Sequence, residues 1–472
     1  MKNVSKIVSL LAIFSLLFVR CSTNDDLFVP DELKLNDFIW KGMNQYYLWQ
    51  NDVANLKDDR FANQNDLNGF LASYSNPNTL FQSLRVDASI DKYSVMYSDY
   101  TVLEGILSGT TKNNGMDYGL KYKTGSTTDI FGFVQYVIPN SDAAAKNMQR
   151  GQLFYAINGT PLTVSNYKSL LANDTYTVNF ANFDNGAITP NGQSIVLSKS
   201  ILSENPVLIN TVISQGTKRI GYLMYNAFYA GYENELNAAI GQLKSQNITH
   251  LVLDLRYNSG GSIATSARLA SMITGQFAGQ LFARQQWNAK MQNYWMQKNP
   301  GQLNTNFATT LSNGSGINNL NLSKVYILTT KSTASASELL INGLKPYMQV
   351  VQIGDVTIGK NVGSVTLYDS PNFGSAGKNT RHNYAMQPIV LKTINAAGFG
   401  EYQSGLQPTI LQIEDLSNVG VLGNPTEPLL QTAINHIMAT GKLNNSTLLS
   451  TQNFETVKNI LPMQDEMYLK LD

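Results

Sequence analysis

Residues 250–261 read HLVLDLRYNSGG, and this stretch decides the fold. Its first half is a nearly all-apolar strand, the pattern expected of a strand that is buried on both faces of a sheet. Its second half ends in the glycine pair Gly260 and Gly261. Glycines at the carboxyl end of such a strand let backbone N–H groups point into the crevice where open α/β sheets bind ligands. The stretch therefore predicts an α/β domain with a site at the end of this strand.

Strand and helix patterns alternate on both sides of this stretch. Strands are predicted at residues 219–224, 250–255, 325–330 and 350–353, and helices at residues 233–243, 264–272 and 339–344. Such alternation favours a mixed or parallel sheet that is covered by helices. The length of 472 residues leaves room for about three domains.

The glycine pair has two interpretations, a phosphate cradle and an oxyanion hole. The sequence has neither a G-x-G-x-x-G nor a P-loop pattern at this position, and no lysine follows the glycines. A nucleotide site is therefore disfavoured. An oxyanion hole needs only backbone donors that are held near a developing negative charge, and this stretch can supply them.

A nucleophile for such a site is offered by residues 331–338, KSTASASE, which lie between a predicted strand and a predicted helix. A hydroxyl at a strand-to-helix turn is exposed and close to the positive end of a helix dipole. The local alternative is a capping box, because Ser335 and Glu338 have the S-x-x-E spacing before an apolar run. Lys360, in the glycine-framed turn VTIGKNVG at 356–363, can serve as a base if its surroundings are apolar.

The amino-acid composition limits the kinds of binding and catalytic site that this chain can form. Thirty-four Lys and Arg against 33 Asp and Glu leave a formal charge of +1, so there is no basic excess to neutralise phosphates, and nucleic-acid binding is excluded. One Cys and three His exclude an internal disulfide and a multi-Cys metal centre, and leave little material for a His-rich one. We expect His250, His382 and His436 to be structural. No metal and no cofactor is expected, so catalysis must rely on hydroxyls, carboxylates, amines or backbone groups.

The amino-terminal residues predict export. After a basic opening, residues 7–19 form an apolar run of about 13 residues, which is shorter than the ~20 that a membrane span needs. We interpret residues 1–20 as a secretory signal peptide. Cys21 stands where a bacterial lipoprotein carries its lipidated cysteine. The alternative is an ordinary signal peptide with a chance cysteine, because Arg20 is not the small residue that cleavage sites favour.

The location that follows from this interpretation is the cell envelope. We expect an exported lipoprotein of a Gram-negative bacterium, in the periplasm or at the outer membrane, that a lipid on Cys21 anchors to the membrane. Residues 21–100 are predicted to form a tether and a small helical region. Apolar and aromatic residues at spacings of three and four indicate amphipathic helices at 31–49 and 64–74, and aromatic residues at such spacing belong to a core more often than to a binding face.

Residues 101–205 have short alternating runs with Gly, Asn and Thr between them, which are typical of strands and tight turns. A strand at 130–138 is followed by a short helix that Asn140 or Ser141 caps, and then by a strand at 152–157 that ends at an Asn-Gly turn. This arrangement resembles a PDZ domain. The alternative is another kind of small β-rich domain.

The resemblance to a PDZ domain implies a groove that holds an extended peptide as an added strand. A glycine-containing loop in such domains binds the terminal carboxylate with backbone N–H groups. Tyr118, Gly119 and Leu120 are the best candidates for that loop. Gln152 stands where members of the family usually have Asp, so the resemblance leaves the ligand groove undecided.

Three motifs in the remaining chain together resemble one family. They are D-L-R-x-N-x-G-G at 254–261, T-A-S-A-S-E at 333–338 and T-x-G-K at 357–360, and a late G-L-Q-P element follows at 405–408. Their order, and the spacing between Ser335 and Lys360, are similar to those of the carboxy-terminal processing, or tail-specific, serine proteases. The resemblance implies an α+β multidomain fold, with a helical cap, the PDZ-like domain, a mixed-sheet α/β catalytic domain of the ClpP/crotonase-like type at 206–440, and a tail at 441–472.

The resemblance also implies the roles of the site residues. Ser335 is the nucleophile and Lys360 the general base of a Ser-Lys dyad that cleaves polypeptides through an acyl-enzyme. The backbone N–H groups of Gly261 and Ala336, together with that of Gly260, are the candidate oxyanion hole.

The third member of the site is left open by the sequence. Relatives place a glutamine four residues after the lysine, where this chain has Ser364. Ser364 and Ser337 are therefore the two candidates for that place. A second function also stays open, that of a catalytically inactive lipoprotein that binds peptide tails without cutting them.

Overall fold

The computed structural model describes residues 28–184, 186–438, 456 and 465–471. The chain splits into two compact units, one of Met1–Gln45 with Trp49–Ala88 and the other of Tyr46–Leu48 with Ser89–Asp472. The predicted signal peptide and the predicted lipid site on Cys21 lie outside the described residues. None of the helices in the described ranges is both long enough and apolar enough for a bilayer crossing.

The first unit is helical, as the sequence predicts. Its helices are α2 (Lys34–Tyr46, whose last residue belongs to the second unit), α3 (Gln64–Leu71) and α4 (Pro77–Ser83). Ile39 and Met43 of α2 and Leu67 and Leu71 of α3 are buried at helical spacing, so apolar stripes form the core of this unit. The side chain of Asn63 caps α3 by accepting a backbone hydrogen bond.

An antiparallel sheet occupies the region that resembles a PDZ domain. Its strands follow the order β3-β4-β5-β7-β8, and β6 pairs with β5. They are β3 (Met116–Tyr122), β4 (Ile130–Val137), β5 (Leu153–Ile157), β6 (Thr160–Pro161), β7 (Thr175–Asp184) and β8 (Ala187–Ser198), with helices α6 (Asp142–Ala145) and α7 (Tyr167–Ala172). The predicted strands and short helix are confirmed, and the Oγ of Ser141 caps α6 by accepting a hydrogen bond from the N–H of Ala144 at 3.1 Å.

The glycine-containing loop that was expected at Tyr118, Gly119 and Leu120 is wrong as local structure, because these residues lie inside β3. They pair with β4 in antiparallel register, and Gly119 is opposite Phe133. The glycine is required by the close approach of an aromatic ring, since a Cβ on residue 119 would lie 2.4 Å from Cε1 of Phe133. A glycine that makes room for a ring cannot be distinguished by sequence from one that shapes a loop.

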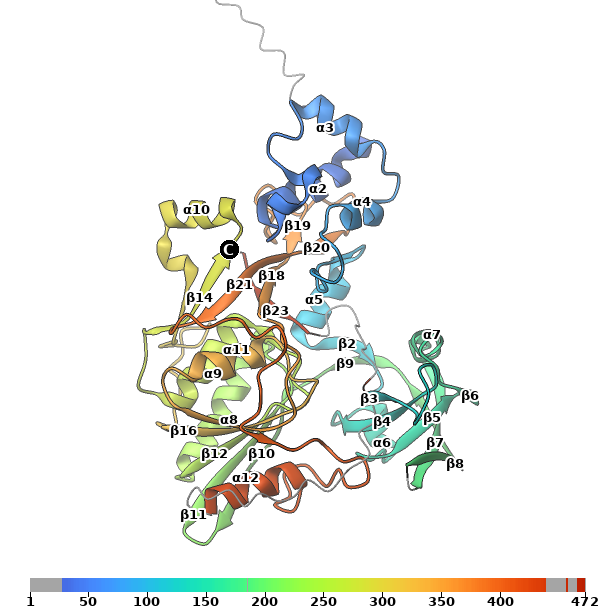
Figure 1. Ribbon diagram of the computed structural model, residues 1–472, viewed down its shortest axis with the longest axis vertical. Coiled ribbons are helices and arrows are strands. Elements are labelled where there is room, and N and C mark those ends of the chain that lie inside the picture. Colours follow the sequence, from blue (N-terminus) through green and yellow to red (C-terminus); the bar gives the residue numbers. More distant parts are fainter. Residues whose placement is uncertain (1–27, 185, 439–455, 457–464, 472) are drawn as a thin grey trace, which may run out of the picture. The chain divides into compact units, whose positions relative to one another are not determined.

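A six-stranded mixed sheet carries the strands that the sequence predicts for the second unit (Figure 1). In order, its strands are β10 (Val207–Gln215), β11 (Lys218–Tyr225), β12 (His250–Asp254), β16 (Lys324–Thr329), β17 (Gln349–Gly354) and β22 (Ile410–Leu411). β10 and β11 are antiparallel and the other neighbours are parallel. Helices α8 (Glu233–Ser245), α9 (Ile263–Thr274) and α11 (Ala336–Leu344) lie on one face and α12 (Pro428–Met438) on the other.

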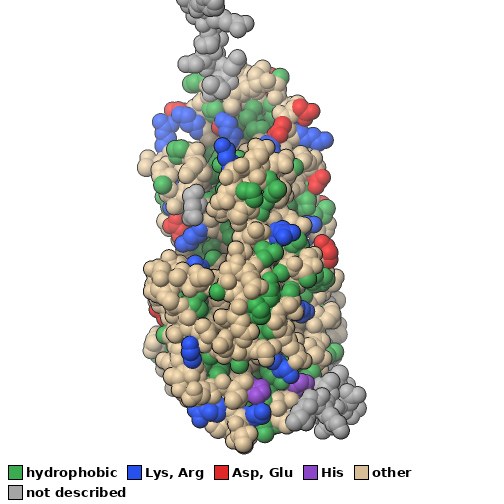
Figure 2. Space-filling view, turned by 90° about the vertical axis from the view of Figure 1, so that its left-hand side faces the viewer, with side chains coloured by type: hydrophobic (Ala, Val, Ile, Leu, Met, Phe, Trp, Pro, Cys, Tyr) green, Lys and Arg blue, Asp and Glu red, His purple; other side chains and the backbone are tan. Residues whose placement is uncertain are grey.

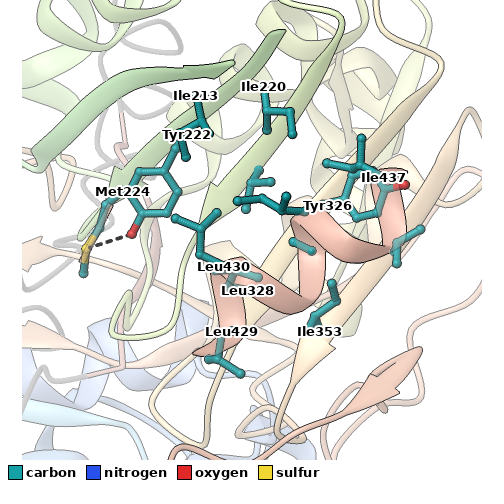
Figure 3. Packing of buried hydrophobic residues seen from close by; sticks show 14 of the residues in the cluster. Ile213, Ile220, Tyr222, Met224, Tyr326, Leu328, Ile353, Leu429, Leu430 and Ile437 are labelled. Carbon is teal, nitrogen blue, oxygen red and sulfur yellow. Dashed lines mark hydrogen bonds between the residues drawn. The ribbon is translucent and has the colours of Figure 1, made fainter. Parts of the chain in front are cut away.

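A cluster of buried apolar side chains joins α12 to this sheet (Figure 3). Leu429, Leu430 and Ile437 of the helix share the cluster with Tyr222 of β11 and Leu328 of β16. Burial of each large apolar side chain contributes about 1.5–3 kcal/mol. This packing therefore fixes the sheet whose strand ends carry the motifs described above.

A second six-stranded sheet is not predicted by the sequence. In order, its strands are β13 (Gly261–Ser262), β23 (Met467–Leu469), β18 (Val362–Val365), β21 (Ile389–Asn395), β14 (Leu281–Trp287) and β15 (Asn304–Asn306). β23 runs parallel to both of its neighbours, with Met467 opposite Gly261 and Tyr468 opposite Ser364. Because β13 begins at the glycine pair and β18 follows Lys360, this sheet borders the motif residues.

The second unit also contains smaller elements. β1 (Val95–Tyr97), β20 (Ala385–Gln387) and β19 (Leu367–Tyr368) form a three-stranded antiparallel sheet, and β2 (Thr110–Asn113) pairs with β9 (Ser200–Ser203). Two further helices are α5 (Tyr100–Ser108) and α10 (Ala289–Lys298).

Charged side chains are sparse on the surface that Figure 2 shows. Lys, Arg, Asp and Glu make up 14% of the sequence, and on this face they are scattered among neutral polar side chains and small apolar patches. This face therefore presents no extended area of one charge.

Candidate active site

Ser335 stands at the turn between β16 and α11 and is completely buried. Its backbone has φ 64° and ψ −115°, a conformation that costs a non-glycine residue on the order of 1–3 kcal/mol. Two hydrogen bonds hold the turn. Thr333 Oγ1 donates to the carbonyl of Leu255 at 2.8 Å. The N–H of Ala334 donates to the carbonyl of Asn258 at 3.1 Å. The Oγ of Ser335 has no hydrogen-bond partner in the described part of the chain, so the turn fixes a free hydroxyl.

The buried carboxylate of Glu338 joins this turn to the turn that carries Lys360. Its Oε2 accepts hydrogen bonds from the N–H of Ser335 at 2.7 Å and from the N–H of Lys360 at 2.8 Å. Its Oε1 accepts from the N–H of Gly359 at 2.7 Å and from Thr357 Oγ1. Burial raises the pKa of Glu338, and these hydrogen bonds oppose the rise. The sequence presents Glu338 in a capping box and in the T-A-S-A-S-E motif, and its linking role is a finding of the structure.

The side chain of Lys360 is buried. Its Nζ donates a hydrogen bond to the carbonyl of Asp465, lies 3.9 Å from Glu466 Oε2, and stands 4.4 Å from the centre of the Tyr93 ring. Gly359 before it has φ 96°, and a Cβ there would lie 2.3 Å from a backbone oxygen. The turn therefore requires glycine at this position.

The glycine pair lies against Ser335. Gly261 has φ 135°, and its N–H donates to the carbonyl oxygen of Glu466. A Cβ on Gly260 would lie 2.7 Å from Ser335 Cβ, 3.1 Å from the backbone nitrogen of Ala336 and 2.2 Å from that same carbonyl oxygen. The acceptor of the Gly261 N–H and the backbone nitrogen of Ala336 thus both lie next to the position that a side chain on Gly260 would fill.

Gly260 differs from the other two predicted oxyanion donors. Its N–H donates to Oδ1 of Asn258 at 2.9 Å, so this group is already committed to the loop. The prediction that Gly260 supplies an oxyanion donor is therefore wrong. Position 260 requires glycine for another reason, because any side chain there would fill the space beside Ser335.

The two candidates for the third member are placed differently by the structure. Ser337 Oγ donates to the carbonyl of Asn258 at 3.0 Å. The proton of this hydroxyl therefore serves the loop that contains Asn258, and Ser337 stays a candidate only as an acceptor. Ser364 Oγ lies 3.2 Å from Glu466 Oε2 and accepts a hydrogen bond from Nε2 of Gln387 at 3.0 Å. Gln387 is a site residue that no sequence spacing reveals.

The three histidines have other partners. His250 begins β12. His382 Nε2 lies 2.9 Å from Asp369 Oδ2, and His436 Nδ1 lies 3.2 Å from the hydroxyl of Tyr326. These contacts agree with the predicted structural roles.

A buried ion-pair network supports the loop below the site. Arg256 is fully buried and pairs with Asp254 at 2.8 Å, Glu427 at 2.6 Å and Glu414 at 3.1 Å. Arg150, from the antiparallel sheet region, pairs with Glu414 at 2.6 Å. Because breaking a buried pair is strongly destabilising, this network ties the loop before the glycine pair to the rest of the unit.

Stability toward acid is predicted to depend on Glu414. Burial raises its pKa, but Arg150 and Arg256 outweigh burial and lower it to about 2. Because the folded pKa lies below the unfolded value of about 4.3, the contribution of the carboxylate is complete above that value and is lost as pH falls toward 2. We expect urea unfolding to show a loss on the order of 3 kcal/mol across this window.

The control for this prediction is a pair of isosteric variants. Glu414→Gln is expected to be less stable at neutral pH and to lose the acid-dependent part of the profile. Glu401→Gln, at an exposed position, keeps the profile of the unmodified protein. Parallel pH profiles for Glu414→Gln and the unmodified protein would contradict the prediction.

Two family models match this chain. The model described as "Peptidase family S41" matches residues 219–385, which contain Gly261, Ser335 and Lys360, and the model described as "Peptidase S41 N-terminal domain" matches residues 34–95. Over these two regions the chain is similar to peptidase family S41. The second match covers most of the helical unit, for which the sequence predicts helices but no role.

The curated proteins that this chain resembles include carboxyl-terminal-processing proteases. The protease of Picosynechococcus is 23% identical over 181 residues, which are 38% of this chain and 38% of the relative. The protease of Synechocystis is 25% identical over 174 residues, which are 36% of this chain and 35% of the relative. The matches thus span little more than a third of each relative's length. The predicted resemblance to the carboxyl-terminal processing serine proteases is confirmed.

Solved structures resemble this chain over a longer range. A protein of Bacteroides fragilis that is assigned to the S41 proteases is 27% identical, with a TM-score of 0.66, and the match covers 88% of this chain and 99% of that one. The photosystem II D1 C-terminal processing protease is 18% identical, with a TM-score of 0.51, and the match covers 85% of this chain and 100% of that one. The second likeness concerns the fold alone.

Proposed function

We propose that this protein is a serine endopeptidase that cleaves polypeptides through an acyl-enzyme, with Ser335 as nucleophile and Lys360 as general base. The observation that carries the proposal is the carboxylate of Glu338, whose Oε2 accepts hydrogen bonds from the N–H groups of both residues. The two turns are therefore held against one another. An inactive peptide-binding protein is not favoured, because a nucleophile, a lysine and the N–H of Gly261 are present at one place.

In the proposed reaction, the neutral amine of Lys360 removes the hydroxyl proton of Ser335 as Oγ attacks the peptide carbonyl carbon. The N–H groups of Gly261 and Ala336 stabilise the charge on the carbonyl oxygen, and each such donor is typically worth about 3–4 kcal/mol. The protonated lysine then gives its proton to the leaving amine, and the acyl-enzyme forms. Water, deprotonated by the same lysine, hydrolyses the ester and regenerates the serine.

Labelling with a serine-directed fluorophosphonate tests this proposal. We expect one labelled residue, Ser335, and a labelling rate that rises with pH because only a neutral amine can act as the base. Ser332→Ala, in the same turn, is the matched control and keeps the labelling. Undiminished labelling of Ser335→Ala would contradict the proposal.

We also propose that the antiparallel sheet engages substrate tails as a PDZ domain does. β3, which contains Tyr118, Gly119 and Leu120, is the edge strand of its sheet, and an edge strand can pair with an added peptide. Thr456 forms an antiparallel bridge with Lys121 of β3, and its Oγ1 accepts a hydrogen bond from Lys121 Nζ at 2.8 Å. Protection of the β3 amides from hydrogen exchange by a tail peptide would support this proposal, and unchanged exchange would contradict it.

Export and lipid anchoring are a further part of the proposed function. The support lies in the basic opening, the short apolar run and the position of Cys21. Incorporation of labelled palmitate that persists in Cys21→Ser would contradict this part.

A further inference from the structure

Residues 465–471 lie in the candidate active site as an added strand. β23 pairs in parallel with β13 on one side and with β18 on the other. β13 begins at the glycine pair and β18 follows Lys360, so the segment fills the slot between the two elements that carry the site. Strand addition of this kind is a common way for proteins to bind extended peptides.

The backbone of this segment contacts the groups that the proposed reaction needs. Lys360 Nζ donates to the carbonyl of Asp465, and the N–H of Gly261 donates to the carbonyl of Glu466. The Glu466 carbonyl oxygen and Ser335 Cβ lie 2.2 and 2.7 Å from the point that a Cβ on Gly260 would occupy. The carbonyl of Glu466 is therefore close to Ser335 and accepts a hydrogen bond from a proposed oxyanion donor, as the carbonyl of a cleaved bond would.

The side chain of Glu466 enters a pocket of hydrogen-bond donors. Its Oε2 lies 3.2 Å from Ser364 Oγ and 3.9 Å from Lys360 Nζ, and Gln387 also hydrogen-bonds with this carboxylate. Thr366 Oγ1 donates to Oε1 of Gln387 at 2.7 Å, which turns the amide so that its NH₂ group faces Ser364. Ser364 is 1% exposed and Gln387 is 0% exposed.

These donors make the pocket selective for an acceptor. The hydroxyl of Ser364 also lies 3.2 Å from the carbonyl oxygen of Met467, so it keeps an acceptor without Glu466. An apolar side chain in the same place would remove the acceptor that faces Gln387 and the carboxylate near Lys360 Nζ, at a cost of about 1–3 kcal/mol. A neutral amide would satisfy only part of the pocket, because its NH₂ group accepts no hydrogen bond. A carboxylate accepts through both of its oxygens, so the chemistry of the pocket matches an acidic side chain.

We infer that this cleft binds a peptide strand with an acidic residue at the position of Glu466, and that residues 465–471 are its resident occupant. The inference rests on the proposed peptidase function, because it assigns the substrate class of that site. In a substrate, the acidic residue would immediately precede the cleaved bond. The carbonyl groups of the resident segment accept hydrogen bonds from the lysine amine and from the N–H of Gly261. An external peptide can therefore enter the cleft only when the segment leaves.

Peptide binding to the full chain tests this inference. The chain carries Ser335→Ala, so nothing is cleaved, and the probes are a fluorescent peptide with the sequence of residues 465–471, DEMYLKL, and its counterpart DQMYLKL. Glu466→Arg in the chain places a cation against Lys360 and expels the resident segment. We expect DEMYLKL to bind at least about tenfold more tightly to the chain with Glu466→Arg, and at least about tenfold more tightly than DQMYLKL, which is the effect of losing one buried partner.

Two further variants keep the test decisive. Lys470→Glu changes the charge of an exposed residue in the same segment and is expected to leave peptide affinity unchanged. Ser364→Ala removes one donor and is expected to reduce the preference for DEMYLKL over DQMYLKL. Thermal melting shows that each variant is folded.

Equal affinity of DEMYLKL for the chains with and without Glu466→Arg would overturn the inference, as would equal affinity for the two peptides. Both results are obtained without turnover. An absence of peptidase activity would instead contradict the proposed function, so the two failures are distinguishable.

Discussion

Lys360→Met lowers kcat/KM for a polypeptide substrate by at least about 10⁴-fold, and Ser335→Ala lowers it to the same level. The reason is that the hydroxyl is a weak nucleophile until a base removes its proton, and the same amine also protonates the leaving group and activates the water. What remains is the contribution of the oxyanion donors and of substrate binding. Because the two residues act as a unit, the double variant is expected to be no slower than either single variant.

The controls for this prediction remove the same charge or the same hydroxyl elsewhere. Lys331→Met, at an exposed position in the nucleophile turn, and Ser332→Ala, beside it, are expected to retain activity within a few-fold. Steady-state cleavage of an unfolded polypeptide is the measurement. Multiplicative losses in the double variant would show that Ser335 and Lys360 act independently, and a fully active Lys360→Met would show that the base is another group.

Glu338→Gln lowers kcat by about 100-fold or more and also destabilises the protein. The carboxylate oxygens face only donors, namely the N–H groups of Ser335, Gly359 and Lys360 and the hydroxyl of Thr357. A glutamine must turn its NH₂ group toward one pair of these donors, which leaves buried N–H groups unsatisfied at about 1–3 kcal/mol each. The two turns then separate slightly, and a misplacement of about 1 Å costs on the order of 100-fold in rate.

The measurements for Glu338→Gln are kcat, KM and the free energy of unfolding in urea. Because Glu338 positions the catalytic turns, kcat is expected to fall while KM stays near its original value. Glu235→Gln makes the same change in an exposed first turn of a helix and is the matched control. A variant with lower stability and unchanged kcat would assign Glu338 a purely structural role.

The turns that carry Ser335 and Lys360 can be predicted from sequence because each follows a buried strand whose apolar run is visible locally. Their meeting cannot be predicted in the same way. It depends on Glu338, whose spacing from Ser335 is that of an ordinary capping box. The same residue therefore supports both interpretations of the segment, and only the tertiary structure shows that it serves the cap and the site together.

Non-local pairing explains most of what the sequence does not show. β13 and β23 are two and three residues long and come from distant parts of the chain, so no local period marks them. Gln387 reaches Ser364 from another strand without a fixed spacing. The loop predicted at Gly119 is wrong for a different reason, because this glycine makes room for the Phe133 ring within a strand.

The position of β23 between β13 and β18 also sets a minimum binding affinity that a substrate needs to enter the cleft. A segment that is tethered to its own binding site competes at an effective concentration on the order of millimolar. A short peptide that binds the cleft alone must overcome that local concentration, whereas a long chain that also pairs with the edge of β3 gains avidity from two attachments. The protein would then select substrates first by their length and by the number of their contacts, and only then by the residues that enter the cleft.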